Sequence, residues 1–196
     1  GSGIISYVLS DICEQVVAVE QDPRMVTKLH DNLDDIANIT IMHGDALTVT
    51  LPTTPYKVFA NIPFHLSSPI LRRLTETEQP PAAIYLIVQR QFADKLLIGN
   101  ENFTGMLGAF IAPRFSVRVR YKLLRSDYKP APAVDTVLVE LLLRDEPLLA
   151  YADMPRYREF VERCFSRQKY FDTLKTGKRP SQLSSDEWLQ LFRTHA

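Results

Sequence analysis

The chain has 196 residues, of which 45% are hydrophobic and 23% charged, a globular composition with room for one ordinary domain and a small addition. No apolar run approaches the roughly 18 residues of a membrane-spanning helix. The net charge is zero, but residues 1–80 hold 5 basic and 10 acidic side chains, whereas residues 111–130 hold 6 and 1. This asymmetry predicts a small-molecule pocket in the first part and a polyanion-binding surface in the second, unless both are ordinary mixed-charge surfaces.

Two cysteines, Cys13 and Cys164, lie far apart without the spacing of a metal site. They indicate buried thiols in a reducing compartment, and no secretory n-region and h-region opens the chain. We therefore expect a cytoplasmic protein with no metal centre.

The chain opens with Gly1-Ser2-Gly3, followed by a helix-like apolar stretch over residues 4–10. Glycines spaced in this way suit a loop that brings backbone close to a ligand, although the same letters can be a cloning remnant. Such a loop normally follows a strand, and no strand precedes Gly1. We therefore expect the first strand of the domain to be missing from the chain.

Residues 15–19 form an apolar run that predicts a buried parallel strand, and the run ends at Glu20. An acidic side chain about 20 residues after a glycine loop can accept hydrogen bonds from both hydroxyls of a ribose. The alternative is a solvated carboxylate at a strand end. Asp22 and Pro23 then predict the cap and first turn of a helix.

The next predicted strand covers residues 38–42 and leads to Gly44 and Asp45. Asp45, in a loop beside a glycine, could accept a hydrogen bond from an adenine amino group. Alternatively, it is a turn residue that satisfies local backbone groups.

Asn61-Ile62-Pro63-Phe64 follows a predicted strand over residues 56–60. Ligands bind at the carboxyl ends of strands in open α/β sheets. The Asn61 amide oxygen and the Ile62 carbonyl can accept from the exocyclic amine of a flat base, Pro63 restricts the backbone, and Phe64 offers a stacking surface. The competing interpretation is a strand end with a proline turn and a core phenylalanine.

Further elements follow in an order typical of α/β proteins. We expect helices over residues 65–74, 89–98 and 103–111, strands over 82–88 and 134–143, a stiff turn at 128–132, and amphipathic helices over 155–166 and 185–193. The strand over 134–143 is expected to be antiparallel to its neighbours.

Residues 114–124 alternate with a period of two, which predicts a strand with one basic face. Arg114, Arg118, Arg120 and Lys122 are candidates for phosphate contacts. An ordinary solvated strand surface is the alternative.

Together these elements predict a doubly wound, Rossmann-like α/β domain over residues 1–147 that binds an adenosine-bearing cofactor, with a small helical cap over 148–196. A nicotinamide dehydrogenase would use the glycine loop and Glu20 but would not require Asn61-Ile62-Pro63-Phe64. The lack of a P-loop argues against phosphoryl transfer.

The order Gly1-Ser2-Gly3, Glu20, Gly44-Asp45, Asn61-Ile62-Pro63-Phe64 resembles that of the rRNA adenine N6-methyltransferases. Residues 126–138 are similar to the family's late motif, which contains P-x-P-x-V-D. The tail around residues 183–189 resembles the macrolide-resistance 23S rRNA (Erm-type) branch more than the small-subunit dimethylases. The resemblance implies an S-adenosylmethionine-dependent methyltransferase sheet with a terminal antiparallel strand.

The resemblance also implies roles for individual residues. S-adenosylmethionine would be held by Gly1, Gly3, Glu20, Gln21, Gly44, Asp45, Ala46 and Asn61, and the target pocket would consist of Asn61, Ile62, Pro63 and Phe64. RNA would be contacted by Arg114, Arg118, Arg120, Lys122 and Lys169. The implied substrate is an adenine flipped out of an unpaired or loosely paired region of 23S rRNA, methylated by a monomer that confers macrolide-lincosamide-streptogramin resistance.

Three alternatives stay open at this stage. The chain could be a small-subunit rRNA adenine dimethylase, or a non-catalytic RNA-binding factor on the same fold. It could also methylate DNA adenine, although the neutral Asn61, where an acidic residue would be expected, weighs mildly against that.

Overall fold

A computed structural model describes residues 1–99, 103–127 and 133–196 of the protein. The chain forms two compact units, residues 1–52 and residues 53–196. The stiff turn expected at 128–132 lies outside the described residues. The division into domains at residue 147 stays a prediction, and the two units are described separately below.

The first unit alternates helices and strands. Its elements are α1 (Ile4–Ser10), β1 (Val16–Glu20), α2 (Pro23–Leu33) and β2 (Ile39–His43). β1 and β2 pair in parallel, with Glu20 opposite His43, so their carboxyl ends meet at one edge. The predicted strands over 15–19 and 38–42 are therefore confirmed to within a residue.

α2 begins where the sequence predicts. The Asp22 side chain accepts from the Arg24 backbone N–H at 2.9 Å, and Pro23 occupies the first turn, where its missing N–H has no cost. Leu29 and Leu33 turn inward, four residues apart on one face, and both are buried.

The second unit is built on a mixed four-stranded sheet. The strands are β3 (Lys57–Asn61), β4 (Ala83–Gln89), β5 (Phe115–Leu123) and β6 (Thr136–Leu143), in the spatial order β3-β4-β6-β5. β3 and β4 are parallel, whereas β6 runs antiparallel to both β4 and β5. The expected antiparallel terminal strand is thus confirmed.

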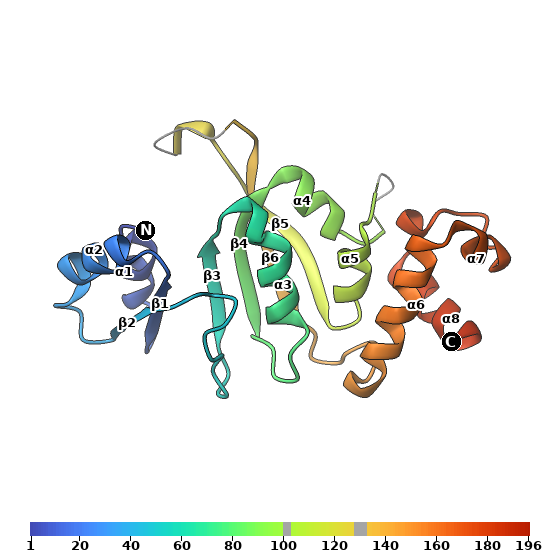
Figure 1. Cartoon of the computed structure of the whole chain (residues 1–196), viewed down its shortest axis with the longest axis horizontal. Coiled ribbons are helices and arrows are strands. Elements are labelled where there is room, and N and C mark those ends of the chain that lie inside the picture. The colour runs from blue at the N-terminus through green and yellow to red at the C-terminus, as the bar shows by residue number, and fades with distance from the viewer. Residues whose placement is uncertain (100–102, 128–132) are drawn as a thin grey trace. The chain divides into compact units, whose positions relative to one another are not determined.

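Three helices cover one face of this sheet (Figure 1). They are α3 (Ser67–Thr75), which follows the short 3-10 turn η1 (Phe64–Leu66), α4 (Arg90–Leu96) and α5 (Met106–Ile111). Leu71 of α3 and Ile84, Leu86 and Val88 of β4 are fully buried, which places a continuous apolar core between the sheet and these helices.

The C-terminal helices share a core with α5. They comprise η3 (Tyr151–Asp153), α6 (Met154–Ser166), α7 (Gln168–Thr173), η4 (Pro180–Gln182) and α8 (Ser185–His195). Ala109 and Phe110 of α5 belong to the same buried cluster as Tyr157, Phe160 and Trp188. These helices therefore pack directly on the sheet-bearing part of the second unit, as Figure 1 shows.

The basic strand departs from the predicted alternation. The register between β5 and β6 shifts between Val119 and Tyr121, so Arg118 lies opposite Glu140 while Lys122 lies opposite Val137. Glu140 and Val137 are an odd number of residues apart and face opposite sides of the sheet. The predicted single basic face is therefore wrong, because a β-bulge at Arg120 moves Lys122 to the other side from Arg118.

No helix in the described part of the chain is long and apolar enough to cross a membrane. Within the same residues, no cluster of three or more His, Cys, Asp or Glu side chains is arranged to hold a metal ion.

Candidate active site

In the first unit, the predicted cofactor residues gather at the carboxyl ends of β1 and β2. The Gly44 N–H donates to the Glu20 carbonyl at 2.9 Å, and His43 Nε2 donates to the Gln21 carbonyl at 3.1 Å. The amino group of Gly1 contacts Glu20 Oε2 directly. The glycine loop, Glu20 and Gly44 therefore lie together, although 43 residues separate the first from the last.

Glu20 is held in place by backbone donors. Its Oε1 accepts from the N–H groups of Gln21 at 2.9 Å and Asp22 at 3.1 Å. Burial acts to raise the pKa of this carboxyl, but the hydrogen bonds from Gly1, Asp22 and Gln21 outweigh burial and lower the pKa below its ordinary value. Glu20 is thus an oriented, ionised acceptor at a strand end.

Two local features require a glycine at position 3. Its φ of +90° lies in the left-handed region, and it caps the start of α1. A Cβ at this position would lie 2.8 Å from Leu33 Cδ1 on α2. Gly3 therefore allows the loop to turn into α1 while α2 packs against it.

Asp45 satisfies a local backbone group, as expected of a turn residue. Its Oδ1 accepts from the Leu47 N–H at 2.8 Å, which is an Asx-type turn. A carboxylate has a second oxygen with further acceptor capacity, so this turn is compatible with a ligand contact. Ala46 follows on the exposed side of the turn.

In the second unit, Asn61 is the last residue of β3, beside Ile87 of β4. Asn61 is exposed, and within the described residues its side chain makes no hydrogen bond. Pro63 has φ −54° and ψ 134°, and its carbonyl accepts from the Leu66 N–H, which starts the turn into α3. Phe64 is 37% exposed rather than buried in the core.

The segment from Asn61 to Phe64 therefore presents the Asn61 amide and the Phe64 ring to solvent, while Ile62 is half-buried. The Ile62 carbonyl accepts no hydrogen bond from the described residues. Acceptors without a partner next to an exposed ring can bind a planar group that carries an N–H₂ donor. The interpretation of Phe64 as a core residue is wrong, because its ring is more than a third accessible.

Among the predicted phosphate contacts, Arg114 requires correction. It precedes β5 and is only 6% exposed. Its Nη1 donates to the carbonyls of Thr75 (3.3 Å) and Thr77 (2.7 Å), and its Nη2 to that of Glu78 (3.1 Å). The guanidinium is therefore occupied at the carboxyl end of α3, where the helix dipole favours a cation.

Arg118 and Arg120 are exposed but share a buried carboxylate. Arg118 donates to Glu140 Oε2, and the Arg120 Nε lies 3.8 Å from Oε1. The hydrogen bond from Arg118 is the main reason that the pKa of Glu140 lies below its ordinary value, although burial opposes it. Lys122 and Lys169 are exposed on β5 and α7.

Sequence reasoning missed the row of side chains to which Glu140 belongs. Phe59, Tyr85, Glu140 and Arg118 lie opposite one another across four strands, and the Phe59 and Tyr85 rings stack at 6.1 Å. Asn61 is two residues beyond Phe59 on the same face, so Arg118 lies roughly 15 Å from it by sheet geometry. The signal was a lone carboxylate inside the apolar run of residues 137–143.

A cavity of about 380 Å³ between the start of α6 and the end of α8 involves none of the predicted site residues. Its charged lining residues are Asp153, Arg156 and Arg193.

Comparison with known proteins places these features in context. The family described as ribosomal RNA adenine dimethylase matches residues 1–180. The ribosomal RNA small subunit methyltransferase A of Streptococcus pneumoniae serotype 2 (strain D39) is 31% identical over 179 residues, which cover 86% of this chain and 62% of that protein. Its counterpart in Streptococcus pyogenes serotype M3 is 30% identical over 163 residues, which cover 78% of this chain and 56% of that protein.

Among solved structures, the 23S rRNA methyltransferase ErmE aligns with a TM-score of 0.83 and 28% identity, covering 98% of this chain and 86% of that one. A dimethyladenosine transferase from Plasmodium falciparum aligns with a TM-score of 0.80 and 22% identity, over 97% and 85% of the two chains, and shows the shared fold alone. The α/β methyltransferase fold expected from the sequence is therefore confirmed. The chain spans less than two thirds of the length of the curated relatives that it matches.

Proposed function

The chain belongs to the ribosomal RNA adenine dimethylase family, and we propose that it transfers methyl groups from S-adenosylmethionine to the exocyclic N6 of an adenine in ribosomal RNA. The observation that carries this proposal is the exposed Asn61 amide, which has no hydrogen-bond partner among the described residues and precedes the outward-facing Phe64. We further propose that the protein acts as a monomer in the cytoplasm.

The chemistry of the target explains why these groups are needed. The lone pair of adenine N6 is delocalised into the ring, so N6 is a poor nucleophile. The Asn61 amide oxygen and the Ile62 carbonyl would accept its two hydrogens and draw them out of the ring plane, which localises the lone pair on nitrogen. Phe64 would stack on the base and stabilise the positive charge that develops on it.

No strong base is required of the chain. N6 becomes acidic as its new bond to carbon forms, and the proton that it loses can pass to water. Most of the rate enhancement would come from holding N6 in line with the methyl donor. The adenine must first leave its stack at a cost of a few kcal/mol, which favours an unpaired or loosely paired target.

The residues of the first unit fit an adenosine-bearing cofactor. The ionised Glu20 at the end of β1 would accept from the ribose hydroxyls, and the backbone of the loop from Gly1 to Gly3 would approach the methionine part. Asp45, with Gly44 and Ala46, would face the adenine, and Gln21 would complete the set in this unit. When bound, S-adenosylmethionine supplies an electrophilic methyl group on a sulfonium sulfur.

Exposed basic side chains would hold the RNA backbone. Arg118, Arg120, Lys122 and Lys169 remain candidates, and Arg114 does not, because its guanidinium is buried. Contacts of this kind would make RNA binding weaken steeply with salt.

Two ribosomal RNAs are candidate substrates. We take 23S rRNA first, with macrolide-lincosamide-streptogramin resistance as the biological role, because this chain and ErmE correspond over most of both lengths. The small-subunit rRNA is the second candidate, supported by 31% identity to a small-subunit methyltransferase. Incubation of the chain with separate 16S and 23S transcripts, followed by mass spectrometry of the nucleosides, distinguishes the two.

The proposed chemistry is tested by Asn61→Ala. We expect methyl transfer to fall by about 100-fold or more, since a preorganised acceptor is lost, while the affinity for S-adenosylmethionine falls far less. His65→Ala is the matched control, because His65 is exposed in the same segment and has no assigned role. Full activity of Asn61→Ala would refute the mechanism. A parent chain that binds RNA but neither binds cofactor nor methylates would favour the non-catalytic alternative.

A further inference from the structure

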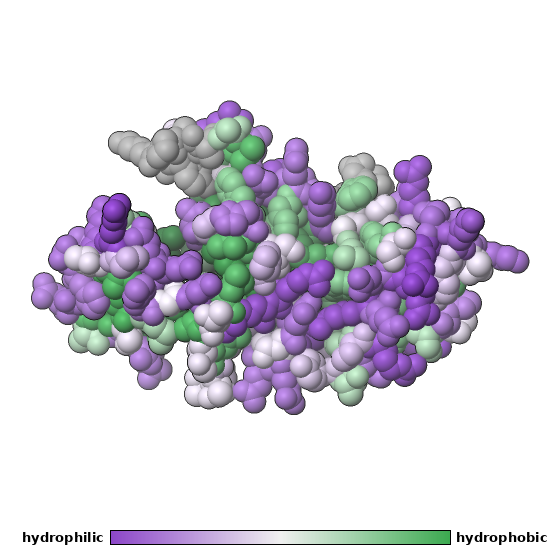
Figure 2. Space-filling view, in the orientation of Figure 1, coloured by the Kyte–Doolittle hydropathy of each residue, from purple (hydrophilic) through white to green (hydrophobic). Residues whose placement is uncertain are grey.

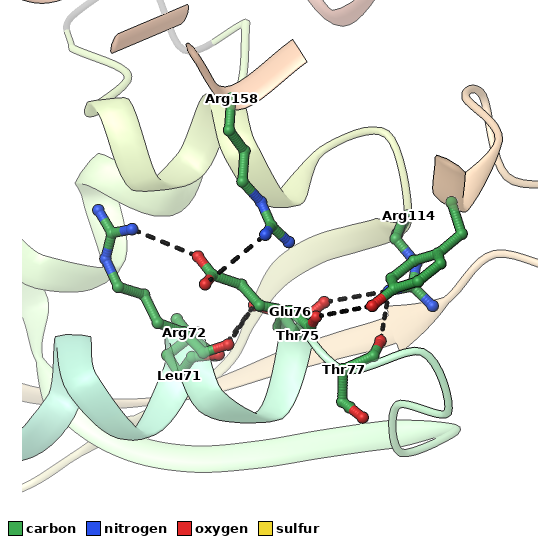
Figure 3. Close-up of polar contacts among 8 residues, drawn as sticks. Leu71, Arg72, Thr75, Glu76, Thr77, Arg114 and Arg158 are labelled. Carbon is green, nitrogen blue, oxygen red and sulfur yellow. Dashed lines mark hydrogen bonds and ion pairs between the residues drawn. The ribbon is translucent and has the colours of Figure 1, made fainter. Parts of the chain in front are cut away.

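A polar network joins the C-terminal helices to the carboxyl end of α3. Glu76, the C-cap of α3, accepts from Arg72 of its own helix at 3.3 Å and pairs with Arg158 of α6 at 3.6 Å. Figure 3 shows the two arginines approaching the carboxylate from different elements. The partly buried side chains of Glu76 and Arg158 are 31% and 22% exposed, so solvent screens this pair less than a surface pair.

Two further contacts connect the same regions. The Tyr151 ring lies over the Arg114 guanidinium at 4.9 Å, and the Tyr151 hydroxyl donates to the Glu76 carbonyl at 3.4 Å. Tyr151 is in η3, just before α6, while Arg114 belongs to the sheet-bearing part and also closes the end of α3. The C-terminal helices thus contact α3 through Tyr151 and Arg158.

This attachment is separate from the apolar one. The shared core connects α6 and α8 to α5, and the Tyr157 hydroxyl donates to the Ala109 carbonyl of α5 at 3.2 Å. The same core also takes in Ile98 beyond α4, and the Thr104 N–H donates to the Ser181 carbonyl of η4 at 2.9 Å. The polar network adds an attachment to α3, which none of these contacts reaches, and so restrains the start of α6 on that side. Hydrophilic surface gathers over α3 and α6 in Figure 2, in keeping with a polar second attachment.

α3 links this network to the proposed target pocket. The segment that ends at Phe64 leads through η1 directly into α3, and α3 ends at Thr75. Three residues of 3-10 turn and nine of α-helix span about 20 Å. A rigid helix therefore has the base-binding segment at one end and the attachment of the C-terminal helices at the other.

Arg158 is placed for this contact rather than for general packing. Its Nε is buried and, within the described residues, lacks a hydrogen-bond partner, which is a cost that the Glu76 pair offsets. Arg163, five residues further along α6, pairs instead with Glu159 of its own helix.

We propose that Glu76, Arg158 and Tyr151 are positioning residues that hold the C-terminal helices at a set distance from Asn61, so that an RNA bound to both is presented with the target adenine in the pocket. The proposal rests on the proposed function for its consequence but not for its geometry. The network itself touches neither base nor cofactor, and its effect on methyl transfer is through the orientation of α6 to α8.

The geometry is tested without any assay of activity. Spin labels at His65 and Lys169, in a chain with the exposed Cys13 replaced by serine, report the distance between η1 and α7. We expect one narrow distance distribution in the parent and a broader one in Glu76→Gln and Arg158→Gln. Glu159→Gln, which removes only a pair within α6, should match the parent. An unchanged distribution in both test variants, or equal broadening in the control, overturns the proposal.

Activity then tests the consequence. The substrate is the full-length rRNA transcript that the parent chain methylates. On this RNA we expect Glu76→Gln and Arg158→Gln to lower kcat/KM by about tenfold or more, with the KM for S-adenosylmethionine unchanged. On a stem-loop too short to reach the C-terminal helices, the same two variants should lose much less of their kcat/KM. Equal loss on both RNAs overturns the positioning role. If the parent methylates neither RNA, the proposed function fails, and the distance measurement still decides whether the network orients these helices.

Discussion

Replacing Arg114 by Met should destabilise the second unit by about 3 kcal/mol. Met keeps a similar apolar stem but removes all three hydrogen bonds to the carbonyls at the end of α3. The Glu78 carbonyl belongs to an exposed residue and can be rehydrated, so the loss comes mainly from the Thr75 and Thr77 carbonyls. At about 1 to 3 kcal/mol for each buried group left unpaired, with a smaller contribution from the contact with Tyr151, the total reaches this value.

The measurement can be made specific to the second unit. Trp188 is the chain's single tryptophan and is fully buried among the C-terminal helices, so its fluorescence reports the unfolding of this unit. At about 2 to 4 °C per kcal/mol for a chain of this size, the midpoint should fall by about 6 to 12 °C. Arg90→Met is the control, because within the described residues the Arg90 side chain makes just an exposed pair with Asp94 of α4, and its loss should shift the midpoint by about 2 °C at most.

The salt dependence of RNA binding can refute the helix-capping role of Arg114. A phosphate contact contributes about 0.7 to 0.9 to the slope of log K against log salt. Arg114→Met, measured well below its midpoint, should leave this slope unchanged, whereas loss of a true phosphate contact lowers it by nearly one. A stable Arg114→Met variant with a reduced slope would show that the guanidinium binds RNA and that the helix-capping role is wrong.

Three further predictions concern single groups. Arg118 holds the pKa of Glu140 below the ordinary 4.5, so this carboxylate stabilises the fold above pH 4.5 and loses that contribution as the pH falls through its pKa in the folded protein. Glu140→Gln should therefore make the free energy of unfolding depend less on pH between about pH 5 and 3. An unaltered pH dependence would contradict this. A Cβ on Gly108 would lie 2.6 Å from the Lys95 carbonyl oxygen, so Gly108→Ala should cost about 1 to 3 kcal/mol in urea unfolding, whereas Gly44→Ala, with no atom within 4 Å, should change stability by less than about 0.5 kcal/mol. At pH 8 a thiol reagent should label only the exposed Cys13, because Cys164 is buried and its pKa is raised to about 11, and rapid labelling of two thiols in the folded protein would contradict the described core.

Local patterns were enough to predict most of the elements. The apolar run before Glu20 and the Asp22-Pro23 pair identify a strand and a helix start that the structure contains almost unchanged. The segment from Asn61 to Phe64 was recognisable because proline and its neighbours restrict their own backbone, whatever the rest of the chain does. The antiparallel β6 could be expected from its place after the basic strand.

Other features depend on partners distant in sequence. The row from Phe59 through Tyr85 and Glu140 to Arg118 requires four strands to be in register, and the bulge at Arg120 depends on how β5 pairs with β6. α7 was missed because the helix has only six residues, too few to show a clear apolar period.

The amino-acid sequence by itself determined the order of the strands and of most helices, and the chemistry offered at the end of β3, because these depend on neighbouring residues. The tertiary structure decided what each charge does. Arg114 and Arg118 look equivalent in the alternating basic stretch. Arg114, however, binds carbonyls at and just after the end of α3, 36 to 39 residues away, whereas Arg118 meets a buried carboxylate across the sheet. A charged side chain takes its role from the groups that folding brings within a few ångströms of it, and no local pattern contains that information.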